Sequence, residues 1–299
     1  MKKKIAWIAG TLLLLVGVGL AAYPFVSNYL NDRNAGSEVM SYLNAAESLT
    51  DEEYARALTA AREYNEALIG SAAVGDPFGK QENGDEQYQS LLNIDGSSVM
   101  GTIEIPVIDV SLAIYHGTGE DALQNGVGHL EGSSLPVGGA GTHAVLTGHT
   151  GMSSRKLFSD IDKLETGDVF LIHVLGDTLA YQVDEINVVL PEETDSLRID
   201  PDQDHVTLVT CTPFGVNSHR LLVRGTRIPY EEAEELFATE SSRRSTWYSE
   251  YGKALFLGAA VMAGILLLFA AARIILRLFR KKTEQETEQK QHGDRKNSP

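Results

Sequence analysis

Cys211 is the only cysteine in this chain of 299 residues, and it ends an apolar run that begins at Val206. A single cysteine can form neither an intramolecular disulfide nor a metal site built from several thiolates. It is therefore a buried hydrophobic side chain, one half of an intermolecular link or a reactive thiol. A loop signal in residues 212–215 follows directly, and a strand that ends in a loop exposes its last side chain at the edge of the sheet.

Two residues elsewhere in the sequence could act together with this thiol. His149 follows an apolar run and lies between Gly148 and Gly151, where small neighbours leave room for a substrate backbone. Arg220 begins another apolar run, and a hairpin between this run and the one ending at Cys211 would bring both side chains together. Acyl transfer from a peptide needs a nucleophile, a proton donor for the leaving amine and a group that stabilises the oxyanion. A thiolate, an imidazole and a guanidinium supply these three roles.

Each of the three residues also has a structural interpretation. Cys211 can be a core filler, His149 a satisfied structural histidine and Arg220 one side of a surface salt bridge. Three other histidines compete with His149 by position: His116, His129 and His143. We interpret His143 as structural. The sequence contains no glycine-rich phosphate loop and no cluster of metal ligands, so we expect no cofactor and no metal.

Two long segments carry no charge, residues 5–31 and residues 254–272. Each is long enough to cross a hydrocarbon core of about 30 Å, which needs roughly 20 helical residues. The first can alternatively be a cleaved signal peptide, although its apolar stretch is longer than such peptides usually have. We expect a membrane anchor over residues 1–31 and a transmembrane helix over residues 254–276.

Basic residues lie between each charge-free segment and the nearer end of the chain. Three lysines, Lys2 to Lys4, precede the first segment, and arginines and lysines from Arg273 to Lys282 follow the second. Because positive residues stay on the cytoplasmic side, both termini, including the tail over residues 277–299, are expected in the cytoplasm. The region between the two segments then lies outside the cell membrane, where a spare thiol is a liability unless it is used.

The formal net charge of the chain is −16, and its first 31 residues contain no acidic side chain. The acidic residues are therefore concentrated in the part expected outside the membrane. Because phosphate contacts need clustered Lys and Arg, such a domain is a poor binder of nucleic acid. A partner with a basic surface is favoured instead.

The region between the two membrane segments divides into three parts. Residues 32–98 are expected to be helical and to end in a loop, because Thr50 opens a capping box and Gly70 ends a run of helical spacing. Residues 99–228 contain short segments rich in Val, Ile, Leu and Thr, bounded by turn residues, which is the pattern of strands. Residues 229–253 are expected to form a helical, acidic linker.

Seven strands are expected in the middle part: Met100–Ile105, Val110–Tyr115, Ala144–Thr147, Val169–Leu175, Leu179–Leu190, Val206–Cys211 and Arg220–Arg227. Short helices are expected between them at Asp121–Asn125 and Ser154–Leu164. Many short strands with few helices favour a mainly β fold that closes, or nearly closes, into a barrel.

The chemistry-bearing residues lie in motifs that resemble those of the sortase family. These are Thr207–Cys211 (Thr-Leu-Val-Thr-Cys) followed by Arg220, and Leu146–His149 (Leu-Thr-Gly-His) before them. The resemblance covers about residues 95–228. It implies an eight-stranded β-barrel in a membrane-anchored cysteine transpeptidase of Gram-positive bacteria. Sortases cleave a Leu-Pro-x-Thr-Gly-like sorting motif after Thr, form a thioacyl-enzyme and transfer the acyl group to an amine.

A second motif is similar to the lid of class C sortases, which assemble pili. The residues Asp76, Pro77 and Phe78 match the Asp-Pro-aromatic lid of that class, in which the Asp pairs with the catalytic Arg and the ring covers the cysteine. Phe departs from the more usual Trp or Tyr. The alternative is an ordinary proline turn.

The resemblance implies a membrane-anchored enzyme that joins pilin subunits through isopeptide bonds. Cys211 is then the nucleophile, His149 the general acid and base, and Arg220 the group that binds the oxyanion or the substrate backbone. The expected partners are pilin or surface proteins that bear a sorting signal, with a pilin lysine as acceptor. Two alternatives remain at this point: a housekeeping sortase that anchors proteins to the cell wall, and a non-catalytic, membrane-tethered binding module.

Overall fold

The structure is a computed structural model that describes residues 2–70, 74–79, 85–150, 152, 155–239, 256–266 and 273. The chain divides into two compact units, Met1–Trp247 and Tyr248–Pro299. The described part of the second unit includes the apolar helix Phe256–Leu266. Much of the expected helix over residues 254–276, the tail over residues 277–299 and the end of the expected linker lie outside the described residues.

Eight strands form a closed barrel in the order β1-β2-β3-β4-β7-β8-β6-β5, which confirms the expected mainly β barrel. The strands are β1 (Val99–Ile105), β2 (Val110–His116), β3 (Val127–His129), β4 (Thr142–Thr147), β5 (Val169–Val174), β6 (Asp177–Val189), β7 (Asp204–Thr212) and β8 (His219–Ile228). The sequence pattern indicates seven of them. β3 is missed because three residues are too few to display an alternating pattern.

Most neighbouring strands in the barrel are antiparallel, but β2 pairs with β3 and β4 pairs with β7 in parallel. The β4–β7 pair matters most for function, because it places the carboxyl ends of both strands at the same edge of the barrel. Alternate side chains of β7, including Val206 and Leu208, are buried in the barrel core. The intervening side chains therefore project from the outer face.

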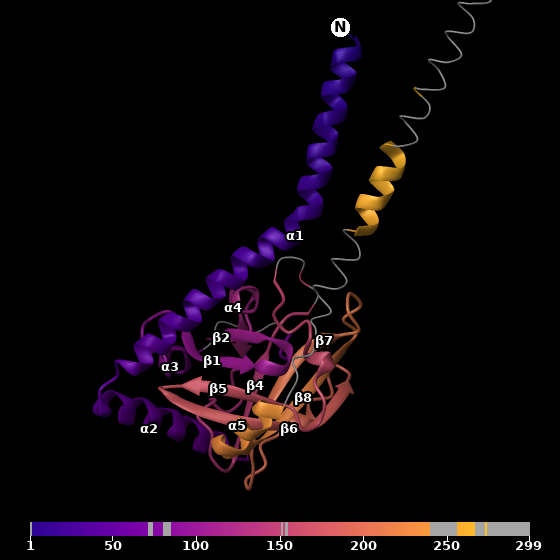
Figure 1. Ribbon diagram of the computed structural model, residues 1–299. Helices are drawn as coiled ribbons and strands as arrows, with labels where there is room; N and C mark the ends of the chain where they lie inside the picture. Colours follow the sequence, from indigo (N-terminus) through magenta and orange to yellow (C-terminus); the bar gives the residue numbers. More distant parts are fainter. Residues whose placement is uncertain are drawn as a thin grey trace, which may run out of the picture. The chain divides into compact units, whose positions relative to one another are not determined.

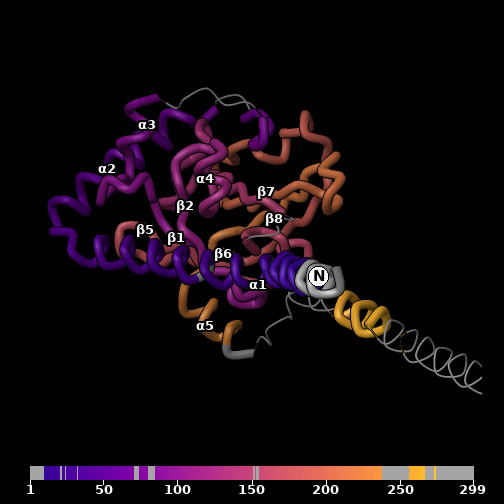
Figure 2. Tube along the Cα trace, turned by 90° about the horizontal axis from the view of Figure 1, so that it is seen from above, coloured from indigo at the N-terminus to yellow at the C-terminus, as the bar shows by residue number. Residues whose placement is uncertain are grey.

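Helices cover the barrel from outside. They are α1 (Lys2–Glu47), α2 (Asp51–Leu68), α3 (Glu86–Ser90), α4 (Glu120–Asn125) and α5 (Tyr230–Thr239). Single 3₁₀ turns occur at Pro106–Ile108, Ile161–Lys163 and Asp195–Leu197. α1 contacts β1 and β2, and α5 contacts β5 and β6. In Figures 1 and 2, α2 and α3 lie on the side of the barrel away from β7 and β8.

The local signals at the helix ends agree in part with the structure. Thr50 caps α2 in the expected capping box, with the Glu53 backbone N–H donating to the Thr50 hydroxyl. α1 is continuous where the sequence indicates separate segments. The short helix expected over Ser154–Leu164 is wrong, because turns and one 3₁₀ turn occupy the described residues there.

The expected transmembrane helices are not confirmed. Among the described residues, no single helix has both the length and the apolar composition needed to span a membrane. The segments Gly10–Leu20 and Phe25–Glu47 satisfy the test only as a pair, with a bend of 41° between them.

Tyr42 fastens α1 to the barrel through a buried phenol. Its hydroxyl donates to the Met100 carbonyl at 2.9 Å and accepts from the Leu175 N–H at 3.1 Å. Burial raises the pKa of Tyr42 to about 12, so the group stays a neutral donor and acceptor. One side chain thus links α1 to β1 and to the end of β5.

We predict that Tyr42→Phe lowers the free energy of unfolding by about 1–3 kcal/mol, because two buried backbone groups lose their partner. Urea denaturation of the full chain in detergent measures this change. Tyr230→Phe is the matched control, since the Tyr230 side chain is 40% exposed and its loss should change stability little. Equal stability of the two variants would show that the phenol of Tyr42 does not fasten α1.

Candidate active site

The antiparallel ladder between β7 and β8 places Cys211 directly opposite Arg220. On the other side of β8, β6 places Val189 opposite the same arginine. Directly paired residues project to the same side of a sheet. Cys211, Arg220 and Val189 therefore form one row on the outer face of β6, β7 and β8, which we call the site face.

The site face is apolar next to the cysteine and polar further away. Two rows follow in the same register: Val209, Leu222 and Asn187, then Thr207, Arg224 and Glu185. Two members of the nearer of these rows, Val209 and Leu222, belong to an apolar cluster. This cluster, here called the site cluster, consists of Leu130, Val145, Leu197, Val209 and Leu222. A peptide that reaches Cys211 along this face would therefore meet an apolar floor.

His149 reaches the same edge through the parallel β4–β7 ladder. Thr147 pairs with Val209, and the Gly148 N–H extends the ladder by donating to the Val209 carbonyl at 3.0 Å. A further bond runs from the buried Thr210 hydroxyl to the Gly148 carbonyl at 2.7 Å. Both the N–H and the carbonyl of Gly148 are therefore hydrogen-bonded to β7. This places His149, the next residue, at the same height along the two strands as Cys211.

Arg220 is largely buried and is held in a planar, two-pronged ion pair by Asp76. Its Nε donates to Asp76 Oδ1 at 2.8 Å and its Nη2 to Asp76 Oδ2 at 2.7 Å. The Nη1 group donates to the carbonyls of Asn217 and His219, both at 3.2 Å. The carboxylate raises the pKa of Arg220 above its ordinary value. The residue therefore stays charged, with its donors occupied from two sides.

Phe78 covers the site from the same short segment as Asp76. Its ring centroid lies 5.7 Å from that of His149 and 5.1 Å from the Arg220 guanidinium carbon. Val74 and Phe78 also pack against the site cluster. The Asp76 carboxylate accepts from the Phe78 N–H at 3.3 Å, which fixes the two side chains relative to each other. Residues 74–79, here called the lid segment, thus close over the imidazole, the guanidinium and the apolar floor.

Electrostatics in this closed arrangement favour neutral forms of the thiol and the imidazole. Burial raises the pKa of Cys211, while Arg220 lowers it and Asp76 raises it. Burial also lowers the pKa of His149, with a smaller opposing contribution from Glu120. Removal of the lid segment would withdraw a negative charge and free the guanidinium. Each of these changes favours the thiolate.

The three histidines that compete with His149 by position are engaged in structural contacts. His143 lies between the Arg198 carbonyl and the Thr207 hydroxyl, and burial lowers its pKa to about 4. His129 contacts the Tyr88 hydroxyl at 2.9 Å and is likewise buried, with its pKa lowered to about 4. The two ring nitrogens of His116 contact the carbonyl oxygens of Ser98 and Leu91. The expectation that His143 is structural agrees with these contacts.

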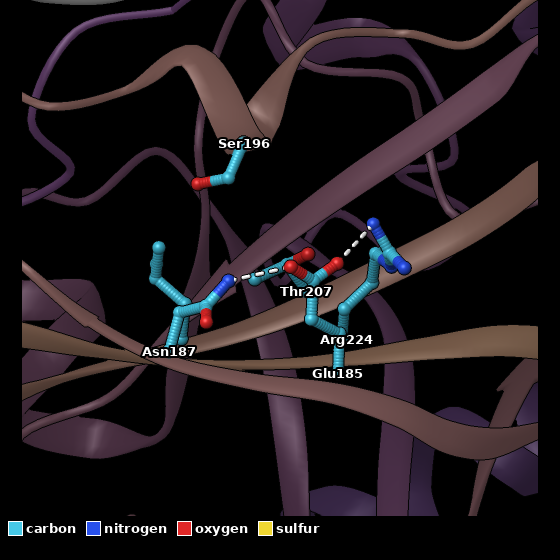
Figure 3. Close-up of a pocket in the computed structure, with 6 residues that line it drawn as sticks. Glu185, Asn187, Ser196, Thr207 and Arg224 are labelled. Atoms are coloured by element: carbon cyan, nitrogen blue, oxygen red, sulfur yellow. Dashed lines mark hydrogen bonds and ion pairs between the residues drawn. The ribbon is translucent and has the colours of Figure 1, made fainter.

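A small open hollow lies further along the site face. Its lining residues are Glu185, Asn187, Ser196, Thr207, Leu222 and Arg224. Figure 3 shows Ser196 across the hollow from the strands, where Glu185 accepts from Asn187 at 2.6 Å and pairs with Arg224. Five of the lining residues belong to the two rows beyond the one that contains Cys211, and none of them pairs with the cysteine. The hollow therefore lies beside the row of the thiol rather than at the thiol itself.

The comparisons with known proteins agree with this geometry. Residues 103–228 match the sortase domain family. Sortase C-1 of Actinomyces oris is 52% identical over 60% of this chain and 99% of that chain, with a TM-score of 0.57. The chain belongs to the sortase family. Two further similarities, to a sortase C-1 and to a sortase A, are described next.

This sortase also resembles sortase C-1 of Streptococcus pneumoniae, with 43% identity, coverage of 65% of this chain and 99% of that chain, and a TM-score of 0.61. Sortase A of Bacillus anthracis is 25% identical over 224 residues, which cover 75% of this chain and 95% of that protein. The solved neighbours named here are sortases of class C, whereas the curated relative is a sortase A. As a sortase, the chain is a cysteine transpeptidase.

The structure places the candidate site residues of this sortase, which were predicted from its sequence, at one edge of the barrel. Cys211 and Arg220 pair directly, and the lid segment connects Arg220 with His149. The sequence did not predict two contacts: the hydrogen bond from the Thr210 hydroxyl to the Gly148 carbonyl, and the packing of Val74 against the site cluster. Alternation along β7 could have indicated the first, because Thr210 must project away from the face that carries Cys211.

We predict that Asp76→Asn moves the pH midpoint of Cys211 alkylation to lower pH. Asp76 raises the pKa of the thiol and Arg220 lowers it, so removal of the carboxylate charge leaves the stabilising guanidinium unopposed. The rate of reaction with iodoacetamide, measured from pH 5 to 10, gives the midpoint. Asp184→Asn is the control, because this carboxylate pairs with Arg224 instead. An unchanged or higher midpoint in Asp76→Asn would contradict this electrostatic account.

Proposed function

We propose that this sortase is a membrane-anchored pilin polymerase of class C. It cleaves a Leu-Pro-x-Thr-Gly-like motif between Thr and Gly and joins the acyl group to a pilin lysine through an isopeptide bond. The observation that carries the proposal is the lid segment, whose Asp76 holds Arg220 in two hydrogen bonds and whose Phe78 contacts His149. The similarity to sortases C-1 supports the same class.

The first half-reaction begins when a sorting signal displaces the lid segment. The Cys211 sulfur attacks the Thr carbonyl carbon while His149 takes the thiol proton. Arg220, released from Asp76, donates to the oxygen that becomes negative. The C–N bond to Gly then breaks, His149 gives its proton to the leaving amine, and a thioester remains on Cys211.

The second half-reaction reverses the same proton path. A neutral lysine amine of the next pilin attacks the thioester carbon, and His149 accepts a proton from that amine. The C–S bond breaks, Cys211 leaves as a thiolate that is reprotonated from His149, and an amide to the lysine side chain forms. The site needs no metal for this sequence, because proton transfer and charge stabilisation are supplied by side chains.

The proposed setting is the outer side of the cell membrane, with both termini in the cytoplasm. The charge-free segments and their basic flanks support this arrangement. The barrel's acidic character favours basic acceptor surfaces over nucleic acid. A lysine-bearing region of a pilin fits that requirement.

We predict that Arg220→Lys lowers the transpeptidation rate by roughly 10²–10³, because lysine keeps the charge but loses the planar pair of donors. His149→Ala should be at least as damaging, and Cys211→Ala should be inactive. His143→Ala should keep measurable activity, since its ring binds Arg198 and Thr207 rather than the site. Near-normal turnover by Arg220→Lys would mean that Arg220 does not bind the reacting group.

A competition between two acceptors tests the pilin proposal against the housekeeping alternative. The full chain in detergent is incubated with a sorting-motif peptide, a lysine-bearing pilin fragment and a cell-wall precursor amine. Mass spectrometry identifies the products. We expect the isopeptide product to dominate. Product only with the wall precursor would support the housekeeping role, and no product with either would support a binding module.

A further inference from the structure

Thr147, the last residue of β4, is fully buried, yet its hydroxyl has no hydrogen-bond partner within the described part of the chain. Its neighbour Leu146 belongs to the barrel core. Alternation therefore turns Thr147 toward the side of Val145, which belongs to the site cluster. The side chain thus projects from the outer face of β4, next to the site face and the apolar site cluster.

The position of Thr147 relative to the reacting groups follows from the ladder. It is directly paired with Val209 on β7, one strand spacing of about 4.8 Å away. Cys211 is two residues further along β7, and His149 two residues further along the chain from Thr147. The hydroxyl is therefore one row from the thiol, on the floor that the lid segment covers through Val74 and Phe78.

An unpartnered hydroxyl at this place is unfavourable for the closed protein. Burial of a hydroxyl without a hydrogen bond opposes folding, whereas valine has nearly the same shape and no polar atom. The residues of the neighbouring site cluster are all aliphatic. Packing alone therefore does not account for a threonine, and buried groups of this kind call for a specific explanation.

A peptide bound on the site face would need such a group. An extended chain presents a carbonyl and an N–H at every residue, and an apolar floor leaves these groups without partners. We propose that the Thr147 hydroxyl hydrogen-bonds the main chain of the acyl-donor peptide once the lid segment has moved away. The hydroxyl then lacks a partner only in the closed state and aligns the peptide one row before the scissile carbonyl. This inference rests on the proposed peptide transfer.

The test compares three variants of the full chain in detergent. Thr147→Val removes the hydroxyl and keeps the shape, and Thr147→Ser keeps the hydroxyl. Thr102→Val is the matched control, because Thr102 is also buried with an unpartnered hydroxyl within the described residues but belongs to β1. The measurements are kcat and KM for a Leu-Pro-x-Thr-Gly peptide, the Cys211 alkylation rate and the midpoint of thermal unfolding.

We expect Thr147→Val to lower kcat/KM about three- to tenfold, the range for one neutral hydrogen bond. Thr147→Ser and Thr102→Val should stay within about twofold of the wild type. The alkylation rate and the unfolding midpoint of Thr147→Val should not fall, because the closed state loses no hydrogen bond.

Three results would overturn the inference. A Thr147→Val variant that matches Thr102→Val in kcat/KM would show that the peptide does not use the hydroxyl, while the proposed function stands. A lower unfolding midpoint in Thr147→Val would point to a partner within the folded protein itself. If the wild type does not cleave the peptide at all, the proposed function fails and this inference falls with it.

Discussion

The guanidinium of Arg220 has one set of planar donors and two competing uses for them. In the closed protein, Asp76 occupies two of these donors with both carboxylate oxygens. A developing oxyanion at Cys211 would need the same group, because the β7–β8 register places the thiol directly opposite. In the proposed mechanism, a substrate therefore replaces the carboxylate before the reaction begins. This competition links the lid segment, the thiol and the site face.

The barrel makes that competition possible by fixing distances that a loop could not. Cys211 and Arg220 lie on adjacent strands of one ladder, and His149 follows a strand parallel to β7. The hydrogen bond from Thr210 to the Gly148 carbonyl fixes the start of the histidine loop. The fold thereby supplies a rigid edge. In the proposed mechanism only the lid segment moves on this edge, so opening changes access and charge without moving the reacting groups.

Much of the fold and the site follows from local sequence signals. Alternating apolar runs indicate seven of the eight strands, and the Thr50 capping box correctly marks the start of α2. Cys211, His149 and Arg220 stand at the ends of such runs, so their approach depends on strands that the sequence already indicates. β3 has three residues and no pattern of its own, and its existence follows from the need to close the barrel.

Other features depend on contacts between residues far apart in the sequence and cannot be read locally. Tyr42 and Thr147 are ordinary residues in the sequence, and only their burial and their partners in three dimensions distinguish them. The register of the closed barrel is equally non-local, because it sets which side chains share a row with the cysteine.

The most direct test of the account is the intact mass of the protein after incubation with a sorting-motif peptide and no acceptor amine. If Cys211 is the nucleophile that the lid segment restrains, a single acyl adduct on Cys211 should accumulate in the wild type and appear faster in Asp76→Asn. The absence of an adduct in both proteins, or an adduct that persists in Cys211→Ala, would contradict the central claim.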